Sequence, residues 1–362
     1  MADGAKDMAL TRRGLLLSGG AAALTIGMPS AAADDLSLRN LTRGIRFGAA
    51  IDAEDLRDPA MRELFRRHCS SLTPRNALKW VGTEKQPGQV QFVDADKIAA
   101  FAREIGAGLY GHTLIWYRVP GWVDAITDPT ELRSAMNRHI DQTVGHFAGQ
   151  VYAWDVVNEV MEYDAAQWRA SVFYRLLGKD HVREAFERAH RADPKAILVI
   201  NETHLEKAGA NYDARRAMML DILRELRAAN APIHAIGLQA HFRPGFDRLD
   251  APALTAFLRE TRKLGLGTYI TEMDGSCKFA HRLPTPDPDV YGRTFADLVR
   301  TVSASGTLKG VTTWGLREKF SKAEAAQGHG CRARALLYDE NMMPLPALDA
   351  LAGALRSAGS GR

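Results

Sequence analysis

The sequence predicts an α/β protein folded as a single (β/α)8 barrel. Short apolar strands alternate with helical segments in eight successive units, and the chain shows no linker or change of composition after residue 34. Polar side chains also gather at the ends of successive strands. Strict alternation is typical of a parallel sheet, and eight units are the number that closes a barrel. A doubly wound open sheet is the alternative, but it would need a glycine-rich phosphate turn where the sequence has Gly48-Ala49-Ala50.

The predicted strands are apolar runs rich in β-branched residues, and they span residues 45–51, 69–74, 108–116, 151–157, 196–201, 234–241, 267–271 and 308–314. The predicted helices carry apolar residues at helical spacing, and they span residues 61–67, 95–105, 131–147, 182–192, 211–229, 254–263, 290–303 and 346–356. Asp94 is the candidate N-cap of the second helix, because a short polar side chain there can accept a hydrogen bond from the first turn.

The composition is that of a globular domain with a large core. The chain has 362 residues, of which 46% are hydrophobic and 25% charged. Its formal net charge of +4 gives no general case for nucleic-acid binding. The three cysteines have no C-x-x-C or zinc-binding spacing, and no H-E-x-x-H motif occurs, so we expect no metal and no other cofactor.

The first 33 residues are typical of a bacterial export signal. Arg12-Arg13 precedes an apolar run at residues 15–28, and residues 30–33 (SAAA) offer a small-residue cleavage site. The apolar run is short and rich in glycine and alanine, which disfavours a membrane-spanning helix; a buried N-terminal helix is the alternative. We expect a signal peptide of the twin-arginine type at 1–33 and a barrel domain at 34–362. The mature protein would be periplasmic or secreted, without membrane contact.

Two of the predicted strands end in a glutamate. The motif WDVVNE ends at Asn158 and Glu159, and the motif TYITEMD contains Glu272 and Asp274. A carboxylate at the end of a buried strand needs a partner or a chemical task. The carboxyl ends of barrel strands meet on one face, so these glutamates are expected to lie together. Glycoside hydrolysis needs two such carboxyl groups, one as general acid/base and one as nucleophile.

The other strand ends are also polar or aromatic. They are Asn76, Lys79, His112, Trp116, Asn201, Glu202, Gln239, His241 and Trp314. Each alone is more often structural, as a salt-bridged carboxylate, a hydrogen-bonded histidine or a core tryptophan. Together they have the composition of a sugar site, since amides and imidazoles suit sugar hydroxyls and tryptophan suits the C–H faces. A polysaccharide is therefore the expected partner, and we expect a monomer.

These motifs, in this order, resemble glycoside hydrolase family 10, the TIM-barrel endo-β-1,4-xylanases, over residues 42–352. The matching motifs are NALKW at 76–80, GHTLIW at 111–116, WDVVNE at 154–159, GLQAH at 237–241, ITEMD at 270–274, TWG at 313–315 and LLYD at 336–339. The resemblance implies a secreted, retaining endo-1,4-β-xylanase that degrades xylan by double displacement.

The resemblance also implies a role for each site residue. Glu159 is the expected acid/base and Glu272 the expected nucleophile, with carboxyl groups about 5–5.5 Å apart. Gln239 should bond Glu159, and His241 should bond Glu272 while Asp274 orients its imidazole. Asn158 is expected at the 2-hydroxyl of the sugar being cleaved, and Asn76, Lys79 and His112 are expected to bind the glycone sugars, with Trp314 stacking in the same region. Trp116 and Gln239 are further expected substrate-binding residues.

Departures from the family pattern fall at Arg75, Arg118, His204 and Lys322. The three cations would either favour an acidic polysaccharide, such as a bacterial exopolysaccharide, or pair with acids such as Glu202 or Glu318. A non-catalytic glycan-binding barrel is the alternative of another class, and the retained glutamates disfavour it.

The cysteines allow one disulfide. Cys277 and Cys331 fall in predicted loops after the seventh and eighth strands, so they could pair after export. Cys69 is then expected to be a buried thiol.

Overall fold

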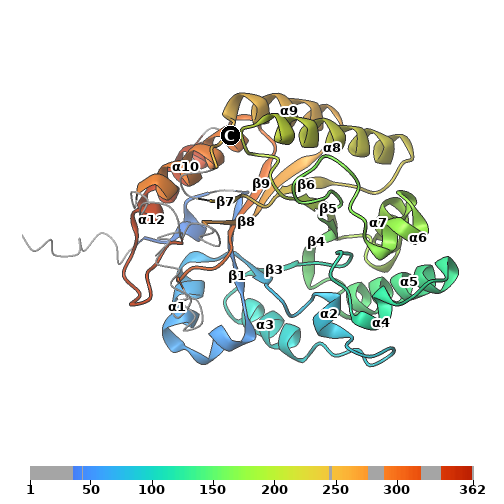
Figure 1. The fold of residues 1–362 in the computed structure, drawn as a ribbon. Coiled ribbons are helices and arrows are strands. Elements are labelled where there is room, and N and C mark those ends of the chain that lie inside the picture. Colours follow the sequence, from blue (N-terminus) through green and yellow to red (C-terminus); the bar gives the residue numbers. More distant parts are fainter. Residues whose placement is uncertain (1–35, 43, 244–246, 276–288, 319–335, 361–362) are drawn as a thin grey trace, which may run out of the picture. The chain divides into compact units, whose positions relative to one another are not determined.

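Parallel strands form a closed barrel inside a ring of helices (Figure 1). The structure is a computed structural model, and it describes residues 36–42, 44–243, 247–275, 289–318 and 336–360. The strand order is β6-β5-β4-β3-β2-β1-β9-β8-β7, and the pairing of β6 with β8 closes the ring. Among the described residues, eight strands make the barrel, and the two-residue β7 is an addition beside β8. The predicted (β/α)8 barrel is confirmed.

The strands are β1 Arg46–Ile51, β2 Ser71–Pro74, β3 Gly108–Gly111, β4 Val151–Asn158, β5 Ile197–Glu202, β6 Ala235–Leu238, β7 His241–Phe242, β8 Gly267–Gly275 and β9 Leu308–Thr313. The helices are η1 Leu38–Asn40, η2 Ala53–Arg57, α1 Pro59–His68, α2 Trp80–Thr83, α3 Val93–Glu104, α4 Gly121–Asp124, α5 Pro129–His146, α6 Val172–Leu177, α7 Asp180–Ala192, α8 Ala210–Ala228, α9 Ala251–Lys263, α10 Asp289–Ala304 and α12 Pro346–Ser360. Each predicted strand and helix has a counterpart, whereas the short helices α2, α4 and α6 were not predicted.

Several predicted element boundaries were wrong. The sixth strand ends at Leu238 rather than at residue 241, and His241 belongs to the separate strand β7. Asp94 is not the N-cap of α3, because the helix begins at Val93 and Asp94 lies in its first turn, 2.9 Å from Lys97. A carboxylate there still stabilises the helix through its dipole. The third strand ends at Gly111 rather than at residue 116, and beyond it Ile115 makes only an isolated bridge to β4.

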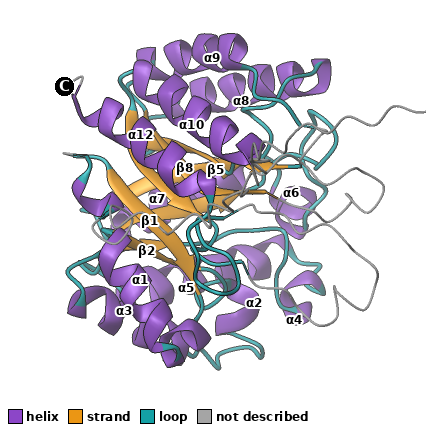
Figure 2. Ribbon diagram, turned by 90° about the vertical axis from the view of Figure 1, so that its left-hand side faces the viewer, coloured by secondary structure: helices purple, strands orange, loops and turns teal. Residues whose placement is uncertain are grey.

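Side chains of the strands fill the inside of the barrel, and side chains of the surrounding helices cover its outer surface. Tyr110, Ala153, Val199, Ala235 and Tyr269 form a buried cluster contributed by neighbouring strands. A second and larger apolar cluster includes residues of the strands and of the surrounding helices. Figure 2 shows the strands from the side, running between α8 and α9 above and α1 and α3 below. Strands buried on both faces explain the continuous apolar runs in the sequence.

Several predictions concern residues outside the described ranges. They are the signal peptide at 1–33, the pairing of Cys277 with Cys331, and the place of Lys322. Cys69 is a buried free thiol, as predicted, and burial raises its pKa. None of the helices in the described ranges is long and apolar enough to cross a membrane.

Candidate active site

The predicted site residues lie at or just beyond the carboxyl ends of the eight barrel strands. Asn76 and Lys79 follow β2, His112 and Trp116 follow β3, Asn158 ends β4 and Glu159 comes next, Gln239 follows β6, His241 begins β7, Glu272 and Asp274 lie in β8, and Trp314 follows β9. Because the strands are parallel, these ends share one side of the barrel. We call this set of residues the strand-end site.

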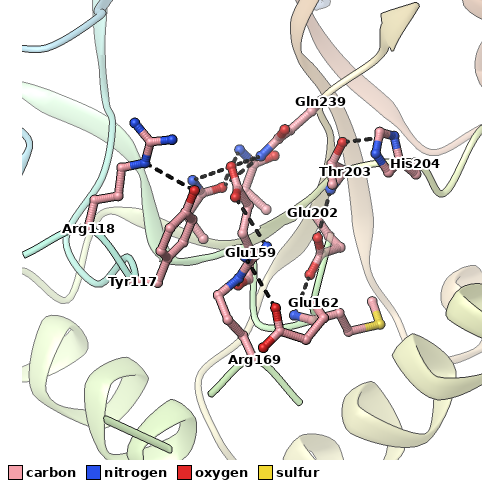
Figure 3. A network of polar contacts seen from close by, with 12 residues as sticks. Tyr117, Arg118, Glu159, Glu162, Arg169, Glu202, Thr203, His204 and Gln239 are labelled. Atoms are coloured by element: carbon pink, nitrogen blue, oxygen red, sulfur yellow. Dashed lines mark hydrogen bonds and ion pairs between the residues drawn. The ribbon is translucent and has the colours of Figure 1, made fainter. Parts of the chain in front are cut away.

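A network of side-chain amides joins the two glutamates. Gln239 Nε2 donates to Glu159 Oε1 and to Asn158 Oδ1, each at 3.1 Å. Asn201 Nδ2 donates to the same Asn158 oxygen at 3.0 Å and to Glu272 Oε1 at 2.7 Å. The expected bond between Gln239 and Glu159 is therefore present (Figure 3). Four strand ends hold the two carboxyl groups in one connected arrangement.

Asn201 is the member of this network whose contact the sequence did not reveal. It was noted only as a polar strand end, yet it bonds Glu272 directly. Thr271 Oγ1 donates to Asn201 Oδ1 at 2.7 Å, which fixes the orientation of the amide. Gly237 leaves the space for it, since a Cβ on that residue would lie 2.3 Å from Asn201 Oδ1.

Glu272 is held in its ionised form. His241 Nδ1 donates to Asp274 Oδ1 at 2.6 Å, and His241 Nε2 donates to Glu272 Oε2 at 3.3 Å, as expected. Burial opposes ionisation of Glu272, but the imidazoles of His112 and His241 outweigh it and lower its pKa from 4.5 to about 2. Burial also disfavours the charged form of His241, but Asp274 and Glu272 raise its pKa well above 6.5.

A second chain of hydrogen bonds orients His112. Tyr110 Oη donates to Asp155 Oδ1 at 2.6 Å, and His112 Nδ1 donates to Asp155 Oδ2 at 2.8 Å. Burial raises the pKa of Asp155. Asp155 was not among the predicted site residues, although a lone aspartate within an apolar strand indicates polar partners.

His112, Asp155 and Glu272 are also the one described cluster whose atoms could reach a metal ion. Their ligand atoms lie within 4.8 Å of one another. Both carboxylates already accept hydrogen bonds, Asp155 from Tyr110 and His112, and Glu272 from Asn201. Each of these carboxylates is therefore already engaged by neighbouring side chains.

Glu159 follows β4 in a left-handed backbone conformation, with φ of 56°. Arg169 Nε donates to the Glu159 carbonyl oxygen at 3.0 Å, and Arg169 Nη2 lies 3.5 Å from Glu159 Oε2 (Figure 3). The same guanidinium lies 3.7 Å from Glu162 Oε2. A strained conformation persists where surrounding contacts hold it, and Arg169 provides such contacts. Arg169 was not among the predicted site residues, because its loop has no periodic pattern that would mark it.

Lys79 and two tryptophans lie beside the glutamates. Lys79 Nζ is 4.8 Å from the centroid of Trp116 and 5.9 Å from that of Trp314, and it donates to Asn76 Oδ1 at 3.3 Å. Burial lowers the pKa of Lys79, although the charges of Glu272 and Glu159 act in the opposite direction. The predicted sugar-binding residues that follow β2, β3 and β9 therefore lie together, beside Glu159 and Glu272.

The arginines that depart from the family pattern, Arg75 and Arg118, differ in their partners. Arg75 Nε lies 3.1 Å from Asp52 Oδ2, so Arg75 is paired, but not with either predicted acid. Glu202 cannot serve as that partner because it is fully buried, 2.9 Å from Arg215 of α8. The prediction of a pair with Glu202 was therefore wrong. Arg118 makes no ion pair within the described residues, and its Nε donates to Tyr117 Oη at 3.0 Å.

His204 lies beside aromatic rings on the opposite side of the strand-end site. It is buried, in a left-handed conformation, and bonds Thr203 Oγ1 at 3.1 Å (Figure 3). The ring of Tyr163 meets its imidazole edge-on at a centroid distance of 4.6 Å.

Comparisons with known proteins agree with this architecture. Residues 37–354 match the family described as glycosyl hydrolase family 10. The chain is 33% identical over 306 residues to endo-1,4-beta-xylanase 2 of Claviceps purpurea, covering 84% of this chain and 86% of the relative. It is 35% identical over 317 residues to endo-1,4-beta-xylanase A of Phanerodontia chrysosporium, covering 84% and 73%.

Solved structures show the same likeness. Native xylanase 10B from Thermotoga maritima superposes with a TM-score of 0.78 at 29% identity, covering 90% of this chain and all of that chain (100%). Xylanase 10B from Thermotoga petrophila, in complex with xylobiose, gives a TM-score of 0.76 at 30% identity, covering 89% and 98%. The chain therefore belongs to glycosyl hydrolase family 10.

Proposed function

We propose that this protein is a retaining endo-1,4-β-xylanase, with Glu272 as nucleophile and Glu159 as general acid/base. The observation that supports it most is the arrangement of the two glutamates. They are linked through Gln239, Asn158 and Asn201, and only Glu272 is bonded by a histidine. The relatives named endo-1,4-beta-xylanase support xylan as the substrate.

In the first step the ionised Glu272 carboxylate attacks the anomeric carbon of the sugar. Its pKa of about 2 keeps it unprotonated, and His241 holds it in place. Glu159 gives its proton to the glycosidic oxygen, so the leaving chain departs as a neutral alcohol. The product of this step is a sugar bound covalently to Glu272.

In the second step Glu159, now a carboxylate, takes a proton from water. The water attacks the anomeric carbon from the side the leaving group vacated, and Glu272 is released. Two inversions give net retention of configuration. Arg169, 3.5 Å from Glu159 Oε2, stabilises the carboxylate that exists between the two steps.

The sugar-binding residues extend this proposal. Asn158 would bind the 2-hydroxyl of the cleaved sugar, and Asn76, Lys79, His112 and Trp314 would contact the glycone sugars. Trp116 and Gln239 would also bind substrate. The ionised, fully hydrogen-bonded Glu272 favours catalysis over a non-catalytic glycan-binding barrel, because binding alone needs no nucleophile held in this way. No cofactor takes part in this chemistry.

The proposal extends to the export of the protein, its oligomeric state and its disulfide. A twin-arginine signal at residues 1–33 would direct export to the periplasm or medium, and the mature barrel would be a monomer. Export would allow Cys277 and Cys331 to form a disulfide.

The test is a screen of neutral and acidic polysaccharides, including xylan, cellulose and mannan, with Glu272→Ala as control. We expect reducing ends to be released from xylan by the wild-type protein and not by Glu272→Ala. Hydrolysis of another polymer with none of xylan would refute the substrate, and equal activity of Glu272→Ala would refute the mechanism.

A further inference from the structure

Arg118 is a cation beside the strand-end site, and no acidic residue in the described ranges pairs with it. Its side chain is exposed, and its Nε donates to Tyr117 Oη at 3.0 Å (Figure 3). The guanidinium carbon lies 5.2 Å from the centroid of Trp116 and 5.5 Å from that of Tyr117. These contacts orient the guanidinium through one nitrogen and leave its two terminal nitrogens available to a ligand.

The neighbouring cations already have partners. Arg75 pairs with Asp52 at 3.1 Å, and Arg169 contacts Glu159 at 3.5 Å and Glu162 at 3.7 Å. Lys79 donates to Asn76. Arg118 differs from these three cations. Within the described residues, its guanidinium makes one hydrogen bond, to the hydroxyl of Tyr117, and no ion pair.

Arg118 is connected to the reacting groups through aromatic rings. Arg169, which contacts Glu159, lies with its guanidinium carbon 4.1 Å from the centroid of Tyr117, the ring whose hydroxyl Arg118 bonds. Trp116, Tyr117, Glu159 and Arg169 also line one small pocket. A polysaccharide seated at Glu159 would therefore bring its side groups within reach of Arg118.

We propose that Arg118 binds a carboxylate carried by the polysaccharide, so that the favoured substrate is a β-1,4-xylan substituted with uronic acid. A planar guanidinium with two free nitrogens matches a carboxylate by two parallel hydrogen bonds. Lys79 is a second cation beside Trp116, with its Nζ 4.8 Å from the centroid of that ring. This inference rests on the proposed function and names the class of substrate that the strand-end site selects.

The experiment compares two polymers that differ only in charge. One is glucuronic-acid-substituted xylan, and the other is the same polymer with its carboxyl groups reduced to primary alcohols. We expect kcat/KM to be about three- to tenfold higher on the acidic polymer at low ionic strength, the range of an exposed charge-assisted pair. The preference should shrink at high salt.

Two variants separate Arg118 from a general effect of charge. Arg118→Gln should bring the ratio of the two kcat/KM values close to one, and Arg118→Lys should restore part of it. Arg138→Gln is the matched control, because Arg138 is an exposed arginine on α5 that makes no ion pair within the described residues. It should keep the wild-type ratio.

The outcomes distinguish this inference from the proposed function. Equal rates on both polymers, or a preference that Arg118→Gln retains, would overturn the role of Arg118 while hydrolysis of xylan stands. If neither polymer is hydrolysed, the proposed function fails. Calorimetric binding of the matching acidic and reduced oligosaccharides then still decides whether Arg118 recognises the carboxylate.

Discussion

At the scale of single residues, the site depends on how its neighbours set the charge of each carboxyl group. Glu272 accepts hydrogen bonds from Asn201 and His241 and is ionised far below neutral pH. Glu159 instead bonds the neutral amide of Gln239 and contacts Arg169. Two glutamates in one site thus have different partners, which suits one to attack and the other to exchange protons.

His241 and Glu272 should each make the free energy of unfolding depend on pH, in opposite directions. Its pKa is raised in the folded protein, so its contribution is complete below about pH 6.5 and is lost as pH rises above it. The pKa of Glu272 is lowered to about 2, so its contribution is complete above about pH 4.5 and is lost as pH falls toward 2.

We therefore expect His241→Gln to reduce the free energy of unfolding by about 1–3 kcal/mol, most strongly between about pH 4.5 and 6.5. Thermal melts of both proteins from pH 3 to 9 measure the difference. A difference in Tm that stays constant across this range would contradict the charged arrangement.

Arg169 is expected to position Glu159. Arg169→Met should lower kcat/KM on xylan by about 10- to 100-fold, because the carbonyl and carboxylate of Glu159 both lose a contact. The loss should be much smaller on an aryl xylobioside with a dinitrophenolate leaving group, which departs without a proton. Arg175→Met is the control, since Arg175 is exposed and pairs weakly with Asp124 at 3.6 Å. Equal losses on both substrates would show that Arg169 acts only on the fold.

At the scale of elements, β5, β6 and β8 meet where their side chains must fit closely. Gly237 of β6 faces Asn201 of β5 and Thr271 of β8, and a Cβ there would lie 2.3 Å and 2.9 Å from their side chains. The glycine is needed because the amide of Asn201 fills the space that a side chain would occupy.

Gly237→Ala should therefore destabilise the protein by about 1–3 kcal/mol and reduce kcat at least tenfold by displacing Asn201. Gly267→Ala is the matched control in β8, because its Cβ would approach the flexible side chain of Lys309 at 3.0 Å and make an ordinary contact with Ala235 Cβ at 3.7 Å. Circular-dichroism melts and xylan assays compare the two variants. Equal effects in both would contradict the importance of Asn201.

The sequence predicted the elements better than the contacts between them. The strand runs and the residues at their carboxyl ends follow from local patterns of apolar and β-branched residues, so Glu159 and Glu272 could be found. Asp155, Asn201 and Arg169 could not be assigned their contacts, because those depend on which strands are neighbours and in what register. Asn201, for example, lies opposite Asn158 only in the folded sheet.

At the scale of the whole molecule, parallel strands place residues from seven different segments on one side of the barrel. No single segment contains both glutamates, so activity requires the closed ring in which β6 pairs with β8. Loss of activity and unfolding should therefore coincide in a chemical denaturation experiment.

Export is the prediction that concerns the chain as a whole. In a bacterial host with a twin-arginine system, we expect the protein outside the cytoplasm to begin after residue 33. Arg12→Lys combined with Arg13→Lys should keep it inside the cell. N-terminal sequencing of the exported protein checks the first point, and cell fractionation the second. Export of the double variant at the normal level would exclude the twin-arginine route.

The proposed mechanism requires Glu272 to form a covalent bond with the sugar. Incubation with a 2-fluoro-xylobiosyl fluoride, which slows the second step more than the first, should trap that intermediate. Intact mass spectrometry should show one added 2-fluoro-xylobiosyl group, and peptide mapping should place it on Glu272. An active protein that gains no label, or a label on any other residue, would contradict the account.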